Sequence, residues 1–102
     1  MDKIKRGRFE RIRGLILYQL VKYYPAPVDH QEIRWFLDDL RYTITEEDLV
    51  FHLAYMEDRG FVKTIVHEHG EVKREMARAT PDGILVVNGK RKDDAIDVES
   101  LP

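Results

Sequence analysis

The chain has 102 residues, 43% of them hydrophobic and 10% aromatic, which is enough to bury the core of one small domain. It contains no cysteine, which excludes disulfides and Cys-ligated zinc. Neither an apolar run of the ~20 residues that span a bilayer nor the apolar stretch of a secretory signal is present, so we expect a soluble, cytoplasmic protein without membrane contact.

The net charge of −2 conceals a strong segregation of charge along the chain. Residues 1–24 carry seven basic residues and two acids, whereas residues 25–60 carry three basic residues and nine acids. The near-neutral total therefore says little about any one surface, and either end of this charge gradient is a possible binding face.

Two amphipathic helices are predicted in the first half of the chain. The first spans about residues 6–23, where apolar residues recur at helical spacing, and it ends at Pro25 and Pro27. The second spans about residues 30–40. Asp29 is its expected N-cap, and Glu32 three residues later gives the pattern of a capping box.

A third helix is predicted in "TEEDLVFHLAYMEDRGF", residues 45–61. Thr45 is the expected cap and Gly60 the expected stop, and the acids Glu46 to Asp48 suit the positive end of the helix dipole. The apolar stripe facing the core is expected to consist of Leu49, Leu53 and Met56.

After residue 61 the side chains follow the two-residue alternation of β-strands instead of the helical period. This pattern predicts a β-hairpin with strands on either side of the turn "HEHG". A short helix follows, with Thr80 as cap, Pro81 in its first turn and Gly89 as its stop. Residues 1–89 are thus expected to form one domain, and residues 90–102 a charged, mobile tail.

This order of elements resembles a winged helix-turn-helix, an α+β, mainly α fold with a three-helix core, a two-stranded β-wing and a short C-terminal helix. The stretches "LILYQLVKYY", "DLVFHLAYMEDRGFV" and "ATPDGILVVNG" carry the resemblance. More narrowly, the chain is similar to the small winged-helix proteins of Mu-like phages and prophages. The resemblance implies a DNA-binding, phage-type transcriptional regulator.

The third helix is placed like a recognition helix, but its sequence is unusual for one. Acids without Lys or Arg repel phosphates, which supply most of the free energy of DNA binding. Its outward positions are expected to include Glu46 and Asp58. An alternative function is therefore a protein-interaction module. Its binding face would comprise Glu47, Val50, Phe51 and Tyr55, unless the apolar residues among them pack on the first helix or the wing.

Basic residues elsewhere offer another route to double-stranded DNA. The start of the first helix and the wing are the candidate phosphate contacts, through Lys5, Arg6, Arg8, Arg11, Lys63, Lys73, Arg74 and Arg78. The same basic start of the chain is also a possible partner for the acidic middle segment of a second copy. A homodimer through the first helix is therefore a competing interpretation.

Catalytic chemistry is not indicated. His67 and His69 share one strand face and are a conceivable metal pair, but two exposed ligands at a hairpin tip favour an ordinary turn. His30 and His52 are isolated in the sequence, and His52 is expected at the edge of the third helix's core face. With no phosphate loop or converging acid pair, we expect neither an enzyme nor a cofactor.

Overall fold

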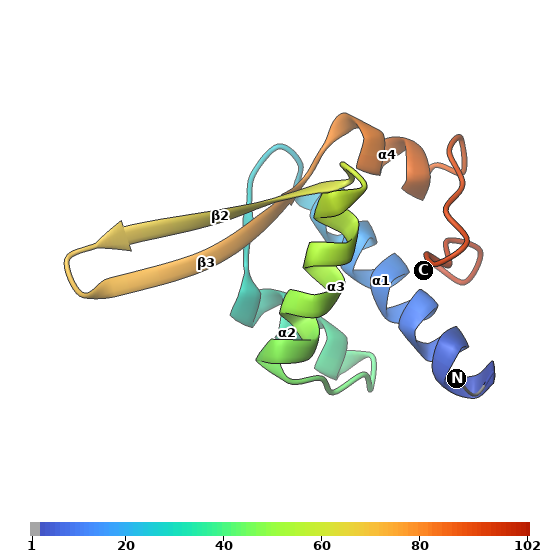
Figure 1. The fold of residues 1–102 in the computed structure, drawn as a ribbon, viewed down its shortest axis with the longest axis horizontal. Coiled ribbons are helices and arrows are strands. Elements are labelled where there is room, and N and C mark those ends of the chain that lie inside the picture. The colour runs from blue at the N-terminus through green and yellow to red at the C-terminus, as the bar shows by residue number, and fades with distance from the viewer. Residues whose placement is uncertain (1–2) are drawn as a thin grey trace.

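A computed structural model describes the backbone of residues 3–102 and the side chains from Gly7 onward. The elements follow in the order α1 (Lys3–Tyr23), β1 (Val28–Asp29), α2 (His30–Asp39), α3 (Glu46–Asp58), β2 (Val62–His69), β3 (Val72–Ala79) and α4 (Pro81–Val87). The helices form a body from which the β2–β3 hairpin projects, giving overall dimensions of 44 × 27 × 23 Å (Figure 1). Within the described residues, none of the helices is long and apolar enough to cross a membrane.

The sheet has three antiparallel strands in the order β1-β3-β2. The hairpin was predicted, and its register runs from Val62 opposite Ala79 to His69 opposite Val72. β1 was not predicted, because two residues are too few to show an alternating pattern. It adds to β3 by pairing Val28 with Ala77, both of which are buried. Three helices followed by a hairpin wing and a short helix confirm the expected winged helix-turn-helix.

The predicted ends of α2, α3 and α4 match the observed ones closely, whereas α1 begins at Lys3 rather than near residue 6. Asp29 caps α2 by accepting from the backbone N–H of Gln31 rather than through the predicted capping box with Glu32, and Thr45 caps α3 in a full capping box with Asp48. Thr80 caps α4, and its hydroxyl also donates to the carbonyl of Gly60 at 2.6 Å, which joins the end of α3 to the start of α4. Gly60 itself has φ +81°, a conformation that costs glycine little.

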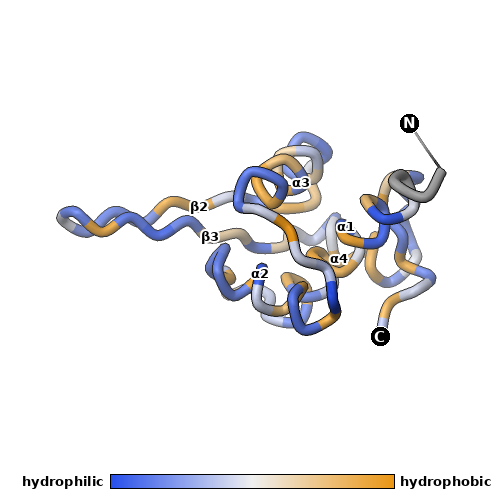
Figure 2. Tube along the Cα trace, turned by 90° about the horizontal axis from the view of Figure 1, so that it is seen from below, coloured by the Kyte–Doolittle hydropathy of each residue, from blue (hydrophilic) through white to orange (hydrophobic). Residues whose placement is uncertain are grey.

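α1 is the central helix of the body and contacts α2, α3, α4 and β3. Every residue from Ile12 to Leu17 is buried, including Arg13 and Gly14, so α1 is covered on all sides over this stretch rather than along one stripe. Apolar residues recur throughout the helices, whereas much of the projecting hairpin is hydrophilic (Figure 2). The core thus lies in the helical body and around the base of the wing.

The C-terminal segment differs from the expectation of a mobile tail. Residues 90–102 turn back along α1 (Figure 1), where Ile96 is only 5% exposed and belongs to the core. The backbone N–H of Asp97 donates to the carbonyl of Glu10 at 3.0 Å. Glycine at position 14 makes this approach possible, since a Cβ there would lie 1.9 Å from the Asp97 carbonyl oxygen. The apolar residues of the tail are few, but Ile96 joins the core, and Val98 and Leu101 pack against it.

Candidate nucleic-acid interface

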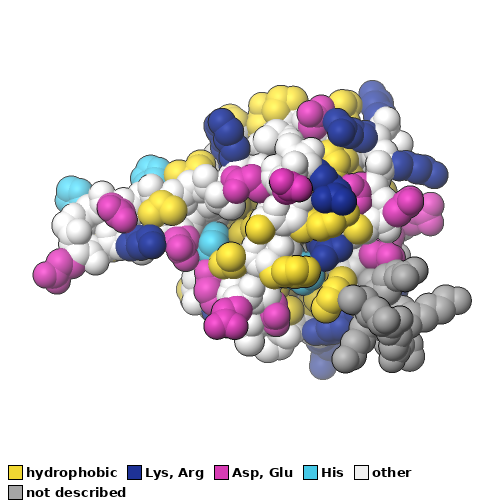
Figure 3. All heavy atoms as spheres, viewed as in Figure 1, with side chains coloured by type: hydrophobic (Ala, Val, Ile, Leu, Met, Phe, Trp, Pro, Cys, Tyr) yellow, Lys and Arg dark blue, Asp and Glu magenta, His cyan; other side chains and the backbone are white. Residues whose placement is uncertain are grey.

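The exposed face of α3, where a winged-helix protein usually reads DNA, is acidic and apolar. Leu49, Leu53 and Met56 are buried as predicted, while Val50 is 46% and Phe51 is 56% exposed. Figure 3 shows hydrophobic side chains gathered over α3 on this face, flanked by acidic side chains. The helix itself contains no Lys or Arg from Glu46 to Asp58 that could meet a phosphate, and the cation beside this face is the C-cap residue Arg59, whose guanidinium lies 3.8 Å from the centre of the Tyr55 ring.

Two of the three acids that open α3 have partners within the fold. The Asp48 carboxylate accepts from the backbone N–H of Thr45 at 3.3 Å and completes the capping box. Glu46 is half-buried, and its Oε1 lies 2.6 Å from Nδ1 of His30. These contacts explain Glu46 and Asp48 through helix capping and packing, without recourse to a nucleic acid.

Beneath the exposed Phe51 lies a buried arginine surrounded by aromatic rings. The Arg13 guanidinium is 4.2 Å from the centre of the Tyr55 ring and 5.6 Å from that of Phe51. Its Nε donates to Nδ1 of His52 at 3.1 Å, and the Tyr55 hydroxyl donates to Asp93 of the tail. Tyr55 is therefore largely committed to packing on α1 and the tail, whereas Phe51 keeps a free outer face.

The electrostatics of this cluster follow from its burial. Burial lowers the pKa of Arg13 from its ordinary value, although the nearby Tyr55 and Asp93 act in the opposite direction. Burial, and next the positive charge of Arg13, lower the pKa of His52 to about 4. His52 thus remains neutral at pH 7 and presents the Nδ1 lone pair to Arg13. It lies within the core, rather than at its edge as the sequence suggested.

The basic start of α1 is only partly described. The side chains of Lys5 and Arg6 lie outside the described residues. Arg8 and Arg11 are exposed and flank Tyr42, with the Arg8 guanidinium 5.1 Å from the ring centre and Arg11 Nη1 donating to the hydroxyl at 3.2 Å. This end of α1 lies at the opposite end of the long axis from the wing (Figure 1), so the two predicted basic regions form separate patches.

The register of the hairpin divides the four basic residues predicted on the wing. Lys63 lies opposite Arg78, and Arg74 lies opposite His67, so Lys63, Arg74 and Arg78 share one face of the sheet. Arg74 also contacts the Asp29 carboxylate at 3.3 Å. Lys73 lies on the other face, opposite Glu68 and 3.8 Å from Glu75. The wing therefore has one basic face and one mixed face.

The mixed face of the wing and α3 enclose an apolar groove of about 190 Å³. Val50, Leu53 and Ala54 line it from α3, and Thr64 and Val66 line it from the mixed face of the wing. Two acids, Glu57 and Glu75, are also part of its lining, and Glu57 is held in place by hydrogen bonds from the backbone N–H and hydroxyl of Thr64 at 2.7 and 2.8 Å. The groove thus combines an apolar floor with acidic edges.

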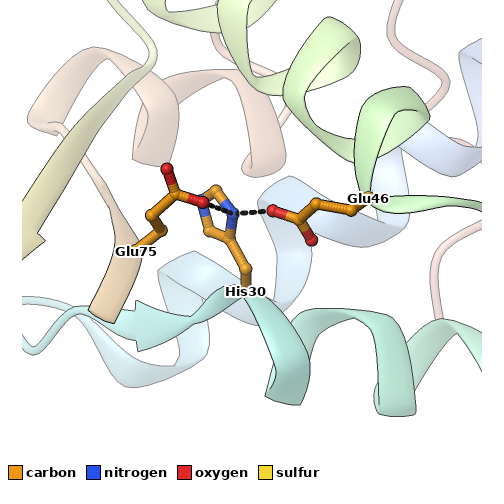
Figure 4. A group of neighbouring side chains, drawn as sticks. All are labelled: His30, Glu46 and Glu75. Atoms are coloured by element: carbon orange, nitrogen blue, oxygen red, sulfur yellow. Dashed lines mark hydrogen bonds and ion pairs between the residues drawn. The ribbon is translucent and has the colours of Figure 1, made fainter. Parts of the chain in front are cut away.

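The acidic neighbours of His30 were not predicted from the sequence, in which this histidine is isolated. His30 starts α2, Glu46 starts α3 and Glu75 lies on β3, and Figure 4 shows both glutamates pointing toward the imidazole ring. Sixteen positions separate His30 from Glu46, and neither residue belongs to a recognisable ligand motif, so only the fold reveals the group. His67 and His69 lie exposed on the wing, where the prediction placed them.

Comparison with known proteins gives likeness in structure but not in sequence. No protein-family model matches the chain, and no curated protein matches it. A transcriptional regulator from Clostridium thermocellum is similar with a TM-score of 0.64 at 25% identity, over 88% of this chain and 82% of that one. A PadR family transcription regulator from Clostridium difficile gives a TM-score of 0.64 at 20% identity, over 78% and 81% of the two chains.

A third solved structure, a PadR family transcriptional regulator from Eggerthella lenta, has a TM-score of 0.62 at 20% identity. The match covers 85% of this chain and 71% of that one. These similarities cover most of both chains in each case, and they establish the winged-helix fold.

Proposed function

We propose that this protein is a winged-helix DNA-binding transcriptional regulator. The observation that carries the proposal is the likeness, over most of both chains, to solved structures described as transcriptional regulators. The phage or prophage type of regulator is a narrower proposal that rests on the sequence resemblance. Neither proposal assigns a catalytic role to the chain.

The distribution of charge favours an unusual mode of contact with DNA. The basic face of the wing, with Lys63, Arg74 and Arg78, is the proposed phosphate contact, supplemented by Arg8 and Arg11 at the start of α1. The acidic face of α3 would read few bases, because its approach to a groove brings carboxylates toward phosphates. We therefore expect weak, salt-dependent binding with little sequence preference.

Fluorescence anisotropy with a labelled random duplex, measured from low to moderate salt, tests this proposal. Lys63→Glu with Arg78→Glu should weaken binding, and each lost phosphate contact should reduce the slope of log K against log salt by about 0.9. Lys73→Glu is the matched control, because Lys73 lies on the other face of the same hairpin. Arg8→Glu with Arg11→Glu tests the second patch separately. Absence of binding even at low salt would overturn the proposal.

A protein partner is the second candidate function, and the groove between α3 and the wing favours it. Its apolar floor and acidic edges suit a basic, amphipathic segment, with Glu47 and the exposed Val50 and Phe51 extending the contact surface. Phe51→Ala should disrupt a purified complex while the chain stays folded with only a small shift of the unfolding transition, because about half of this side chain is exposed and the rest packs on Phe9 and Arg13. A complex that tolerates this change would exclude the α3 face as the binding surface.

A homodimer through α1 also remains a proposal, with a geometric restriction. Residues Ile12 to Leu17 are buried within a single chain, so the middle of α1 is not available to a partner while the tail occupies it. From Gly7 onward, the exposed side chains of α1 lie toward its ends and include Arg8, Arg11 and Lys22, so these ends are the proposed contact surface.

A further inference from the structure

Three potential metal ligands from three different elements meet at the base of the wing. Nδ1 of His30 lies 2.6 Å from Oε1 of Glu46 and 3.8 Å from Oε2 of Glu75, and the three ligand atoms all lie within 4.8 Å of one another (Figure 4). His30 comes from the first turn of α2, Glu46 from the first turn of α3 and Glu75 from β3. The group borders an open cavity of about 330 Å³.

Each ligand is held in a way that suits coordination. The His30 residue is only 8% exposed, which fixes the imidazole with Nδ1 facing the two glutamates. Each glutamate directs one oxygen toward His30 and the other toward a cation. Oε2 of Glu46 is 3.9 Å from Arg34, and Oε1 of Glu75 is 3.8 Å from Lys73. Supporting contacts of this kind orient carboxylate ligands in metal sites.

The separations are close to those of a metal centre. In a tetrahedral site with bonds near 2 Å, ligand atoms lie about 3.3 Å apart, and the observed 2.6 and 3.8 Å fall on either side of this value. Both glutamate side chains are 42% exposed, so they are free to rotate into place around the fixed imidazole. The open cavity beside them provides a path for entry.

We propose that His30, Glu46 and Glu75 bind a divalent first-row transition-metal ion that joins α2, α3 and the wing. One imidazole nitrogen and two carboxylates suit Zn²⁺, Co²⁺ or Mn²⁺, whereas Mg²⁺ prefers a site made only of oxygen ligands. The bound ion would fix the angle of β3 relative to the start of α3. This inference goes beyond the proposed function, and its test does not depend on DNA binding.

The test is titration of the chelator-treated full chain with Zn²⁺, Co²⁺ and Mg²⁺ by isothermal calorimetry, with the visible spectrum of Co²⁺ as a report on its ligands. We expect one equivalent of Zn²⁺ or Co²⁺ to bind, much more tightly than Mg²⁺, and to raise the thermal midpoint. His30→Gln should weaken binding by more than the roughly 10- to 100-fold that loss of a supporting residue costs.

Glu46→Gln and Glu75→Gln keep the test decisive if His30→Gln fails to fold, because both glutamates are half exposed and their amides are isosteric. The matched control is His67→Gln with His69→Gln, which removes the exposed histidines of the wing. Binding that is lost in the glutamate variants but kept in this control supports the site. Absence of binding, or binding that depends on His67 and His69, would show that the three side chains only contact one another, and it would overturn the proposal.

Discussion

Gly14→Ala is the most informative single change in this chain, because the packing of the tail determines the sign of its effect. In an isolated helix the replacement stabilises by about 1 kcal/mol, since alanine is the better helix former. Here the added Cβ would lie 1.9 Å from the carbonyl oxygen of Asp97, a distance at which the tail backbone has to move. The intrinsic gain is thus opposed by the loss of the tail's contacts.

The size of that loss follows from the contacts of the tail. Releasing Ile96, which is 5% exposed, costs about 2 kcal/mol of apolar burial. Loss of the hydrogen bond from Asp97 to Glu10 costs about 1 kcal/mol. Part of this loss of free energy is offset by the higher helix propensity of alanine and by the conformational entropy that the released tail regains. We expect Gly14→Ala to lower the free energy of unfolding by about 1–2 kcal/mol in the full chain.

Urea unfolding followed by circular dichroism measures this difference, with the slope checked for constancy between variants. The same replacement in a chain ending at Gly89, once that shorter chain is shown to be folded, should stabilise by up to about 1 kcal/mol. Gly7→Ala is the matched control on the same helix, because no atom lies within 4 Å of its Cβ position. Gly7→Ala should change the free energy of unfolding by the same amount in the full and the shortened chain.

A stabilising effect of Gly14→Ala in the full chain, equal to that in the shortened one, would refute the reasoning. It would mean that residues 90–102 do not lie on α1 in solution. The original expectation of a mobile tail would then hold, with a domain ending at residue 89.

Two further predictions concern His52 and Thr45. Because the pKa of His52 in the folded chain is about 4, below its ordinary 6.5, the unfolded chain binds the extra proton. Stability is therefore complete above pH 6.5 and should fall by about 2 kcal/mol between pH 7.5 and 5. His52→Asn retains an acceptor for Arg13 but does not titrate in this range. In urea unfolding at pH 7.5 and pH 5, it should therefore abolish this contribution to the pH dependence of the free energy of unfolding. Thr45→Ala should cost about 1 kcal/mol by removing the capping box of α3, and an unchanged urea midpoint would contradict this.

The local features of the fold could be read from the sequence because their causes lie within a few residues. Thr45 and Thr80 cap helices through backbone groups three positions away, and Gly60 ends α3 through its own φ. The hairpin likewise shows itself by alternation on both sides of a short turn. Such signals determined the number, order and approximate ends of the helices, and the presence of a wing.

Tertiary structure decided the features that depend on distant residues. Arg13 belongs to a basic run in the sequence, yet it is buried against Tyr55 and His52, because the tail and α3 close over that side of α1. Which face of the wing each basic residue occupies depends on the register between β2 and β3. A count of charges along the sequence does not include this register.

The candidate metal group shows most clearly that contacts between distant residues could not be predicted from the sequence. His30, Glu46 and Glu75 are ordinary residues in their local contexts, and each is explained there as an early helical residue or a strand residue. The sequence by itself determined that α2 and α3 begin at His30 and Glu46. Only the packing of these two helix starts against β3 brings their side chains within reach of one ion, because it fixes the distances between elements that no local interaction relates.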